Sequence, residues 1–121
     1  MKVLSRITAV SMLLLFVIGA SPNPSAAAQP DPVLEWINIM NTTALAGGTP
    51  PFFTSRVAAM VSASVFDSVN GIDPRFQPIH VPPNAPQGAS ARAAAIEAAY
   101  VILAHAYSAQ APVLTAQVQA S

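Results

Sequence analysis

The sequence predicts an all-α fold, a partial bundle of about four helices that are joined by proline-rich loops and follow an amino-terminal signal peptide. Hydrophobic residues make up 53% of the 121 residues, and charged residues make up only 8%, whereas an average domain has about 25%. The apolar residues recur at helical spacing, and 12 prolines separate the helical stretches from one another. Such a chain folds by burying helical faces, and its length suits one small domain.

Residues 1–28 have the organisation of a secretory signal peptide. Lys2 and Arg6 provide a positive start, an uncharged apolar run follows, and small residues near Ala28 suit a peptidase. The alternative is an uncleaved membrane anchor, although the apolar run is shorter than the roughly 20 residues that span a bilayer. We therefore expect export to the periplasm or the extracellular space, with residues 29–121 forming the helical domain.

Charge and cysteine content exclude several classes of function. The exported part carries three arginines, no lysine and five carboxylates, so its formal net charge is −2. A nucleic-acid partner is not expected, because the chain has no basic stripe to neutralise phosphates. The chain contains no cysteine, which excludes disulfides, thiolate catalysis and cysteine zinc sites. Stability must come from packing.

The first helix is predicted from Asp31, as its N-cap, towards Ala46. Pro32 suits the first helical position, where its missing N–H is harmless, and a Gly-Gly-Thr-Pro-Pro run follows the helix. Four residues at positions i, i+3, i+4 and i+7 form the predicted apolar face: Val33, Trp36, Ile37 and Met40.

The second helix is predicted to begin near Thr54 or Ser55 and to end at Asn70-Gly71, with the glycine as a left-handed C-cap. Its expected inner stripe consists of Val57, Met60, Val61, Ser64, Val65 and Ser68. Many alanines and serines leave little bulk on this helix, so other helices can approach closely. We therefore expect it to be the buried central helix.

Residues 73–88 contain five prolines, so they form neither a regular helix nor a central strand. A third helix is predicted from Ala89 or Ser90 through 91–106. It presents Ile96, Tyr100, Leu103 and Tyr107 at helical spacing.

Pro112 opens a predicted fourth helix that passes through Val118 and stops at Ser121 without a cap. From this abrupt stop we expect a truncated or split product.

No catalytic, cofactor-binding or metal-binding residue is predicted in this chain. The sequence lacks phosphate loops, dinucleotide motifs, nucleophile elbows and HExxH motifs. His80 and His105 lie 25 positions apart with no carboxylate at helical spacing from His105, which favours surface or packed histidines over metal ligands.

Two further patterns resemble sites only weakly. Asp67, Asn70 and Asp73 suggest a calcium loop, but their spacing is three and no bidentate glutamate follows, so a helix end and a turn explain them better. Ser55-Arg56 followed by Ser62 resembles a phosphatase motif in which a histidine is required. Because that imidazole is absent, the motif supplies no nucleophile.

The exported part is similar to the amino-terminal region of bacterial vanadium-dependent haloperoxidases, relatives of the type 2 phosphatidic acid phosphatases. The resemblance spans about residues 31–120. It is carried by Val33-Leu34-Glu35-Trp36-Ile37-Asn38, Thr49-Pro50-Pro51, Ser55-Arg56-Val57-Ala58-Ala59-Met60-Val61, Phe66-Asp67-Ser68-Val69-Asn70-Gly71-Ile72, Gly88-Ala89-Ser90 and Tyr107-Ser108-Ala109-Gln110. One departure is Ser62, where the family commonly has a histidine.

The resemblance implies a helical bundle whose vanadate or phosphate site uses a lysine, two arginines and two histidines from motifs far downstream of this region. None of those motifs occurs here. The complete homologous protein would oxidise halide with hydrogen peroxide or hydrolyse phosphate esters, and vanadate is expected only there. This chain alone is expected to be inactive.

Two functional hypotheses follow. In the first, the chain is the amino-terminal segment of such a protein, and its partner is the missing carboxy-terminal catalytic half or a second copy of itself through apolar helix faces. The alternative is a small secreted helical binding or scaffold protein without catalysis. The two hypotheses differ in whether residues 29–121 melt cooperatively as a defined oligomer or behave as a loosely packed, aggregation-prone chain.

Overall fold

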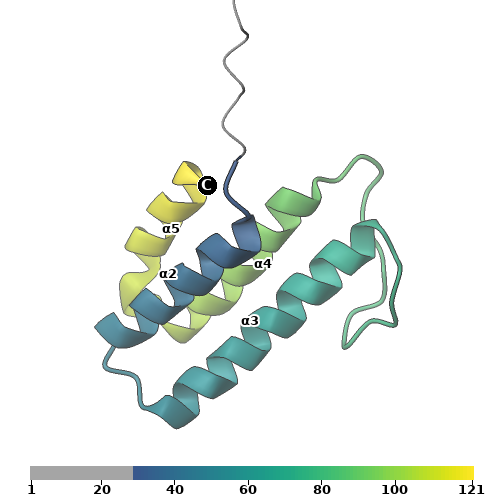
Figure 1. The fold of residues 1–121 in the computed structure, drawn as a ribbon. Helices are drawn as coiled ribbons and strands as arrows, with labels where there is room; N and C mark the ends of the chain where they lie inside the picture. Colours follow the sequence, from purple (N-terminus) through teal and green to yellow (C-terminus); the bar gives the residue numbers. More distant parts are fainter. Residues whose placement is uncertain (1–28) are drawn as a thin grey trace, which may run out of the picture.

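The computed structural model describes residues 29–121, and the predicted signal peptide lies outside these residues. The described part contains four α-helices and no strand, so the predicted all-α partial bundle is confirmed (Figure 1). The elements are α2 (Pro32–Ala46), α3 (Pro51–Ile72), α4 (Ala91–Ala106), the 3₁₀ turn η1 (Ser108–Gln110) and α5 (Ala111–Ala120). No helix in residues 29–121 combines the length and the hydropathy needed to cross a bilayer.

The predicted caps of the first and third helices are present. The Asp31 carboxylate accepts the backbone N–H of Val33 at 2.8 Å and that of Leu34 at 3.4 Å. The Ser90 hydroxyl accepts the backbone N–H of Ala93 at 3.3 Å. Each cap satisfies backbone donors that the first helical turn leaves without an intrahelical partner.

Helix α4 lies at the centre of the bundle, with α2, α3 and α5 packed around it (Figure 1). The core combines one or more buried side chains from each of the four helices: Trp36, Met40, Val61, Ile96, Ala99, Leu103 and Leu114. The prediction that α3 is the buried central helix is therefore wrong. Helix α4 takes that place because its buried alanines let neighbours approach on several sides, while α3 buries only three of its 22 residues.

The inward face of α2 is rotated from the predicted one. Trp36 and Met40 are buried as expected, but the buried set continues with Thr43 and Ala44. Val33 and Ile37 are each 40% exposed. The predicted face was wrong by part of a turn because Trp36, which meets the Tyr100 ring edge-on with centroids 6.5 Å apart, sets the direction of contact.

Helix α3 is longer than predicted at both ends. It begins at Pro51 and continues through Asn70-Gly71 to Ile72, so the predicted left-handed C-cap at Gly71 is wrong. The glycines of the described residues that do have positive φ are Gly48, at 59°, and Gly88, at 80°. The Asn70 side chain accepts N–H groups of the following loop, and helix α3 continues two residues beyond Asn70, to Ile72.

One polar cluster joins the N-terminal ends of α2 and α4 to the C-terminal end of α5. Arg92 donates to the carbonyl oxygen of Pro30 at 2.6 Å and to that of Ser121 at 2.8 Å. Its guanidinium also lies 3.7 Å from the Glu35 carboxylate, which accepts the Ser121 hydroxyl at 3.2 Å. At the other end, the Gln110 amide donates to the Thr43 carbonyl at 2.9 Å. These bonds hold α2 and α5 in place against α4.

Candidate functional site

The connection between α3 and α4 folds back along α3 and is held there by Asp67. One carboxylate oxygen of Asp67 accepts the backbone N–H of Ile79 at 2.7 Å. The other oxygen accepts the N–H groups of His80 at 2.7 Å and Val81 at 2.9 Å. Asp67 is only 7% exposed, so the loop covers the group that binds it.

Asn70 holds the first part of the same loop, one helical turn beyond Asp67. Its side-chain oxygen accepts the backbone N–H groups of Arg75 and Phe76, both at 3.0 Å. Its side-chain nitrogen donates to the Phe76 carbonyl at 2.9 Å. The ring centroids of Phe66, on α3, and Phe76, in the loop, lie 6.0 Å apart. The loop is therefore fixed to α3 at two successive turns.

The sequence explains why side chains, rather than backbone carbonyls, accept the N–H groups of the loop. Prolines have no N–H, and a loop with five prolines cannot pair its remaining N–H groups in a helix or a regular ladder. A carboxylate and a carboxamide at positions i and i+3 lie on the same helix face and reach the same neighbouring segment. Asp67 and Asn70 thus supply the acceptors that the loop backbone lacks.

The pKa of Asp67 lies below its ordinary value of 3.8. The hydrogen bond from the Val81 N–H is the largest cause, and burial of the carboxylate opposes it. The N–H groups of Ile79 and His80 and the charge of the His80 imidazole lower the pKa further. The carboxylate is accordingly ionised at neutral pH.

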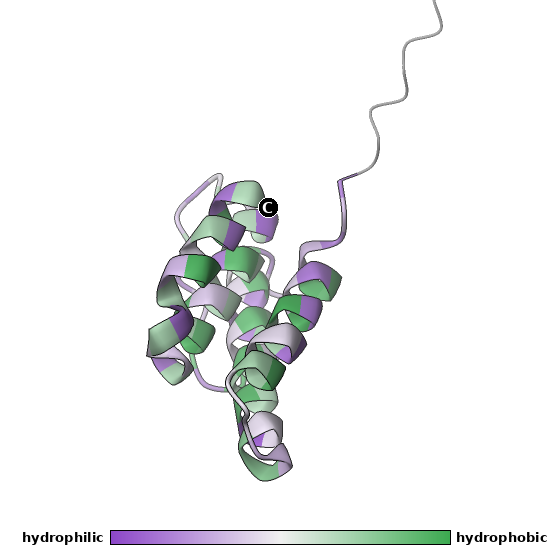
Figure 2. Ribbon diagram, turned by 90° about the vertical axis from the view of Figure 1, so that its left-hand side faces the viewer, coloured by the Kyte–Doolittle hydropathy of each residue, from purple (hydrophilic) through white to green (hydrophobic). Residues whose placement is uncertain are grey.

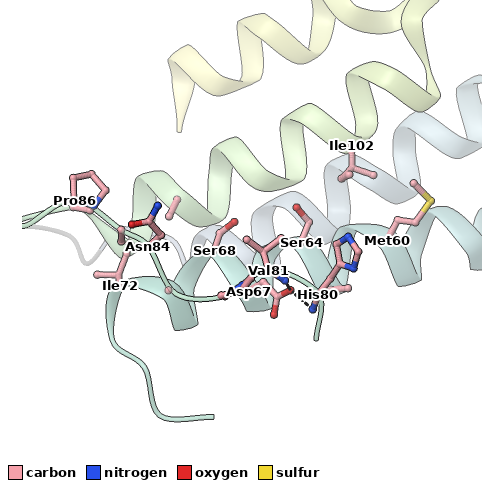
Figure 3. Close-up of a pocket in the computed structure, with 16 residues that line it drawn as sticks. Met60, Ser64, Asp67, Ser68, Ile72, His80, Val81, Asn84, Pro86 and Ile102 are labelled. Carbon is pink, nitrogen blue, oxygen red and sulfur yellow. Dashed lines mark hydrogen bonds between the residues drawn. The ribbon is translucent and has the colours of Figure 1, made fainter. Parts of the chain in front are cut away.

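A pocket of about 690 Å³ lies between α3, the loop and α4, and Figure 3 shows its lining. Its wall is mostly apolar, with side chains from all three elements: Met60, Ile72, Val81, Pro82, Pro86 and Ile102. Its polar groups are Ser64, Asp67, Ser68, His80 and Asn84. A volume of this size, with few polar groups among apolar ones, is typical of small-molecule sites.

The polar groups of the pocket are suited to binding rather than to nucleophilic catalysis. Within the described residues, neither the Ser64 nor the Ser68 hydroxyl has a hydrogen-bond partner, and no bond joins Ser64 to the His80 imidazole. Both oxygens of Asp67 already accept backbone N–H groups, so this carboxylate does not orient the histidine ring. Among the described residues that line this pocket, the structure does not bring an acid, a base and a nucleophile into mutual contact, as acyl transfer requires.

The two histidines and the aspartates of the calcium-like pattern have other surroundings in the structure. His80 is exposed at the pocket, and His105 is exposed near the end of α4. Of the calcium pattern, Asp67 accepts N–H donors, which a bound cation would repel, and Asp73 accepts the Arg75 guanidinium at 2.7 Å. In residues 29–121, no three histidine, cysteine, aspartate or glutamate side chains form a group that could hold a metal ion.

The three arginines within residues 29–121 lie in three different surroundings. Arg92 belongs to the polar cluster at the ends of α2, α4 and α5, and Arg75 pairs with Asp73. Arg56 lines a second pocket of about 500 Å³, beside the turn at 47–50 and Tyr107. None of the three lines the pocket between α3 and the loop.

The pocket and the anchoring role of Asp67 and Asn70 are not predicted from the sequence, in which both residues indicate a helix end and a turn. The available signal was a carboxylate and a carboxamide one turn apart, directly before a segment whose backbone N–H groups lack partners. Ser64 and Ser68 were expected on the inner stripe of the helix, and they line the pocket that adjoins this stripe.

Comparisons with protein-family models, with curated proteins and with solved structures found no match to this chain.

Proposed function

We propose that this chain is the exported amino-terminal helical segment of a vanadium-dependent haloperoxidase-like protein, and that it covers the catalytic helical domain of that protein without supplying catalytic groups. The resemblance over residues 31–120 supports the choice of family. The observation that carries the proposed role is a set of large apolar side chains that the four helices leave uncovered.

The two most exposed of these side chains, Leu45 and Phe52, lie on α2 and on the first turn of α3, and the same two helices also expose Leu34 and Phe53. Leu34 is 63% exposed, Leu45 is 82% exposed and Phe52 is 77% exposed. Phe53 is 55% exposed, and its ring meets that of Phe52 edge-on at 5.7 Å. Figure 2 shows that hydrophobic residues recur along the helices. Several large apolar side chains exposed on so small a domain are typical of a surface that another protein covers.

The chemistry of this surface favours an apolar helical partner. The last eleven residues of α2, from Trp36 to Ala46, include no charged side chain, so electrostatic attraction contributes little to docking there. Exposed leucine and phenylalanine side chains on helices pack best into the grooves of another helical surface. The catalytic domain that the resemblance implies is a helical bundle and suits this role.

The arrangement of the cations supports a role without catalysis. Vanadate and phosphate carry several negative charges, and a site for them gathers cations around the anion. Arg92 and Arg75 instead bind groups of this chain, and Arg56 lies apart from both. The lysine, arginines and histidines that the resemblance implies would come from the partner domain.

Activity assays on the purified full chain test this role. With added vanadate, we expect background rates for bromide oxidation by hydrogen peroxide and for hydrolysis of p-nitrophenyl phosphate. We also expect no stoichiometric binding of vanadate in equilibrium dialysis. Turnover above background that is lost on Arg56→Ala would overturn the proposal, because it would place an oxyanion site within this chain.

A second candidate function is that of a small secreted helical binding protein. The pocket of about 690 Å³ beside a loop that Asp67 fixes in place favours it. This function requires that the chain alone elute as one defined species at every concentration. Size-exclusion chromatography over a range of concentrations distinguishes it from the first candidate, which predicts concentration-dependent association through the uncovered side chains.

A further inference from the structure

We propose that the pocket between α3, the loop at 73–90 and α4 is a binding site for an uncharged small molecule that has an apolar body and one hydroxyl or carbonyl group. The inference is independent of the proposed function, because the pocket lies along the second half of α3 and the uncovered phenylalanines lie at its start. It rests on the size of the pocket, on its free hydroxyls and on its charges.

The size and lining of the pocket determine the body of the ligand. Its volume of about 690 Å³ falls within the roughly 300–1,000 Å³ of small-molecule sites. Met60 and Ile72 line the pocket from α3, and Ile102 lines it from α4. These side chains offer dispersion contacts and no hydrogen bonds, so the part of the ligand against them is apolar.

The polar group of the ligand is determined by Ser64 and Ser68. The two serines are one helical turn apart, and Figure 3 shows their hydroxyls directed towards the side on which Ile102 lies. Serine hydroxyls within helices often bond the carbonyl four residues earlier, as Ser55 does at 2.9 Å. Ser64 and Ser68 make no such bond within the described residues, so each is free to donate to, or accept from, a ligand.

The charges of the pocket exclude an ionised ligand. No lysine or arginine lines it, so an anion would lose its hydration without gaining a cation. The one carboxylate, Asp67, faces the N–H groups of residues 79–81, which compensate its charge. A cationic ligand would have to compete with these three donors. The remaining polar groups are hydroxyls, an imidazole and the Asn84 carboxamide, which suit an uncharged partner.

Asp67 acts here as a positioning residue. By fixing Ile79, His80 and Val81 it holds the loop wall of the pocket before any ligand arrives. A wall that is already ordered reduces the entropy that binding must remove. The pocket is therefore already formed before a ligand binds.

Three naphthalene compounds test the site on the purified full chain by equilibrium dialysis. We expect 1-naphthol to bind saturably at one equivalent, about three to ten times more tightly than naphthalene, because one hydrogen bond to a serine is worth this ratio. 1-Naphthyl phosphate, which has the same ring and a double negative charge, should bind more weakly than either. Equal binding of the phosphate, or a naphthol isotherm that does not saturate, would overturn the proposal.

Matched variants locate the site. Ile102→Phe should fill the pocket and reduce naphthol binding at least tenfold, whereas Val101→Phe, on the exposed side of the same helix, should leave it unchanged. In the double variant Ser64→Ala, Ser68→Ala, the introduced alanines favour helix, so α3 should stay folded. This variant lacks both hydroxyls and should bind naphthol no more tightly than naphthalene. Circular dichroism confirms that each variant is folded. If Ile102→Phe lowers stability, the serine variant alone decides: an unchanged preference for naphthol would contradict the assignment.

Discussion

The carboxylate of Asp67 on α3 accepts the backbone N–H of Val81 at 2.9 Å, across 14 positions of the chain. This bond joins a regular helix to a loop that has no regular structure of its own. Together with the bonds to Ile79 and His80, it lets one side chain fix the position of residues 79–81. The wall of the pocket beside α3 depends on the same carboxylate.

Replacing Asp67 by asparagine should release this segment. The variant keeps the shape of the side chain, but it has only one acceptor oxygen and directs an NH₂ group at backbone donors. We expect the amide protons of residues 79–81 to exchange faster with solvent and the melting temperature to fall. Hydrogen exchange followed by NMR measures the first effect. Asp73→Asn is the control, because the Asp73 pair with Arg75 is exposed and should contribute little.

The stability of the chain should fall in acid as Asp67 takes up a proton. Its pKa is lowered on folding from an ordinary value of 3.8, so the unfolded chain binds the proton more tightly than the folded chain does. The contribution of Asp67 is therefore fully present above pH 3.8 and is lost as the pH falls through the lower folded pKa. Urea unfolding between pH 2 and pH 6 measures this loss, and the Asp67→Asn variant should show a flatter pH profile. A profile identical to that of the unmodified chain would contradict the assignment.

Leu103 should be among the most sensitive core positions. Its side chain is 0% exposed in the last turn of α4, where it belongs to the shared core. Leu103→Ala should lower the free energy of unfolding by about 2–5 kcal/mol, because it removes apolar contacts and leaves a cavity. Val101→Ala, two residues away on the same helix and 52% exposed, should change it by no more than about 0.5 kcal/mol. Similar losses in both variants would mean that α4 is not central.

The N-cap of α4 should contribute measurably to stability. Ser90→Ala removes the acceptor of the Ala93 N–H and should lower the free energy of unfolding by about 1 kcal/mol. Ser62→Ala is the matched control, since Ser62 is exposed in the middle of α3 and alanine favours helix. Chemical unfolding curves of both variants, compared with the unmodified chain, give the difference.

The sequence predicts where helices form better than it predicts which helix the others surround. Asp31-Pro32 and Ser90 gave correct helix starts because capping depends on residues close in sequence. Which helix occupies the centre depends on how all four faces fit together. The small residues of α3 and those of α4 allow the same close approach, so composition alone favoured the wrong one.

The loop anchor and the pocket could not be predicted for a related reason. An aspartate and an asparagine near a helix end are also typical of turns, and only the path of the following chain distinguishes the two uses. Asp67 lies 12 to 14 positions from the N–H groups that it binds. The prolines indicated that the segment is irregular, but not that it folds back over α3.

In the proposed role, the uncovered side chains of α2 and α3 dock on the catalytic domain of a haloperoxidase-like protein. The most direct test is sedimentation velocity of the full chain mixed with such a domain from the same source organism. We expect a 1:1 complex that Phe52→Ser, Phe53→Ser weakens at least tenfold, whereas Thr42→Ser, an exposed polar change on α2, leaves it intact. Two separately sedimenting species for the unmodified chain, or a complex unaffected by the phenylalanine changes, would contradict the claim.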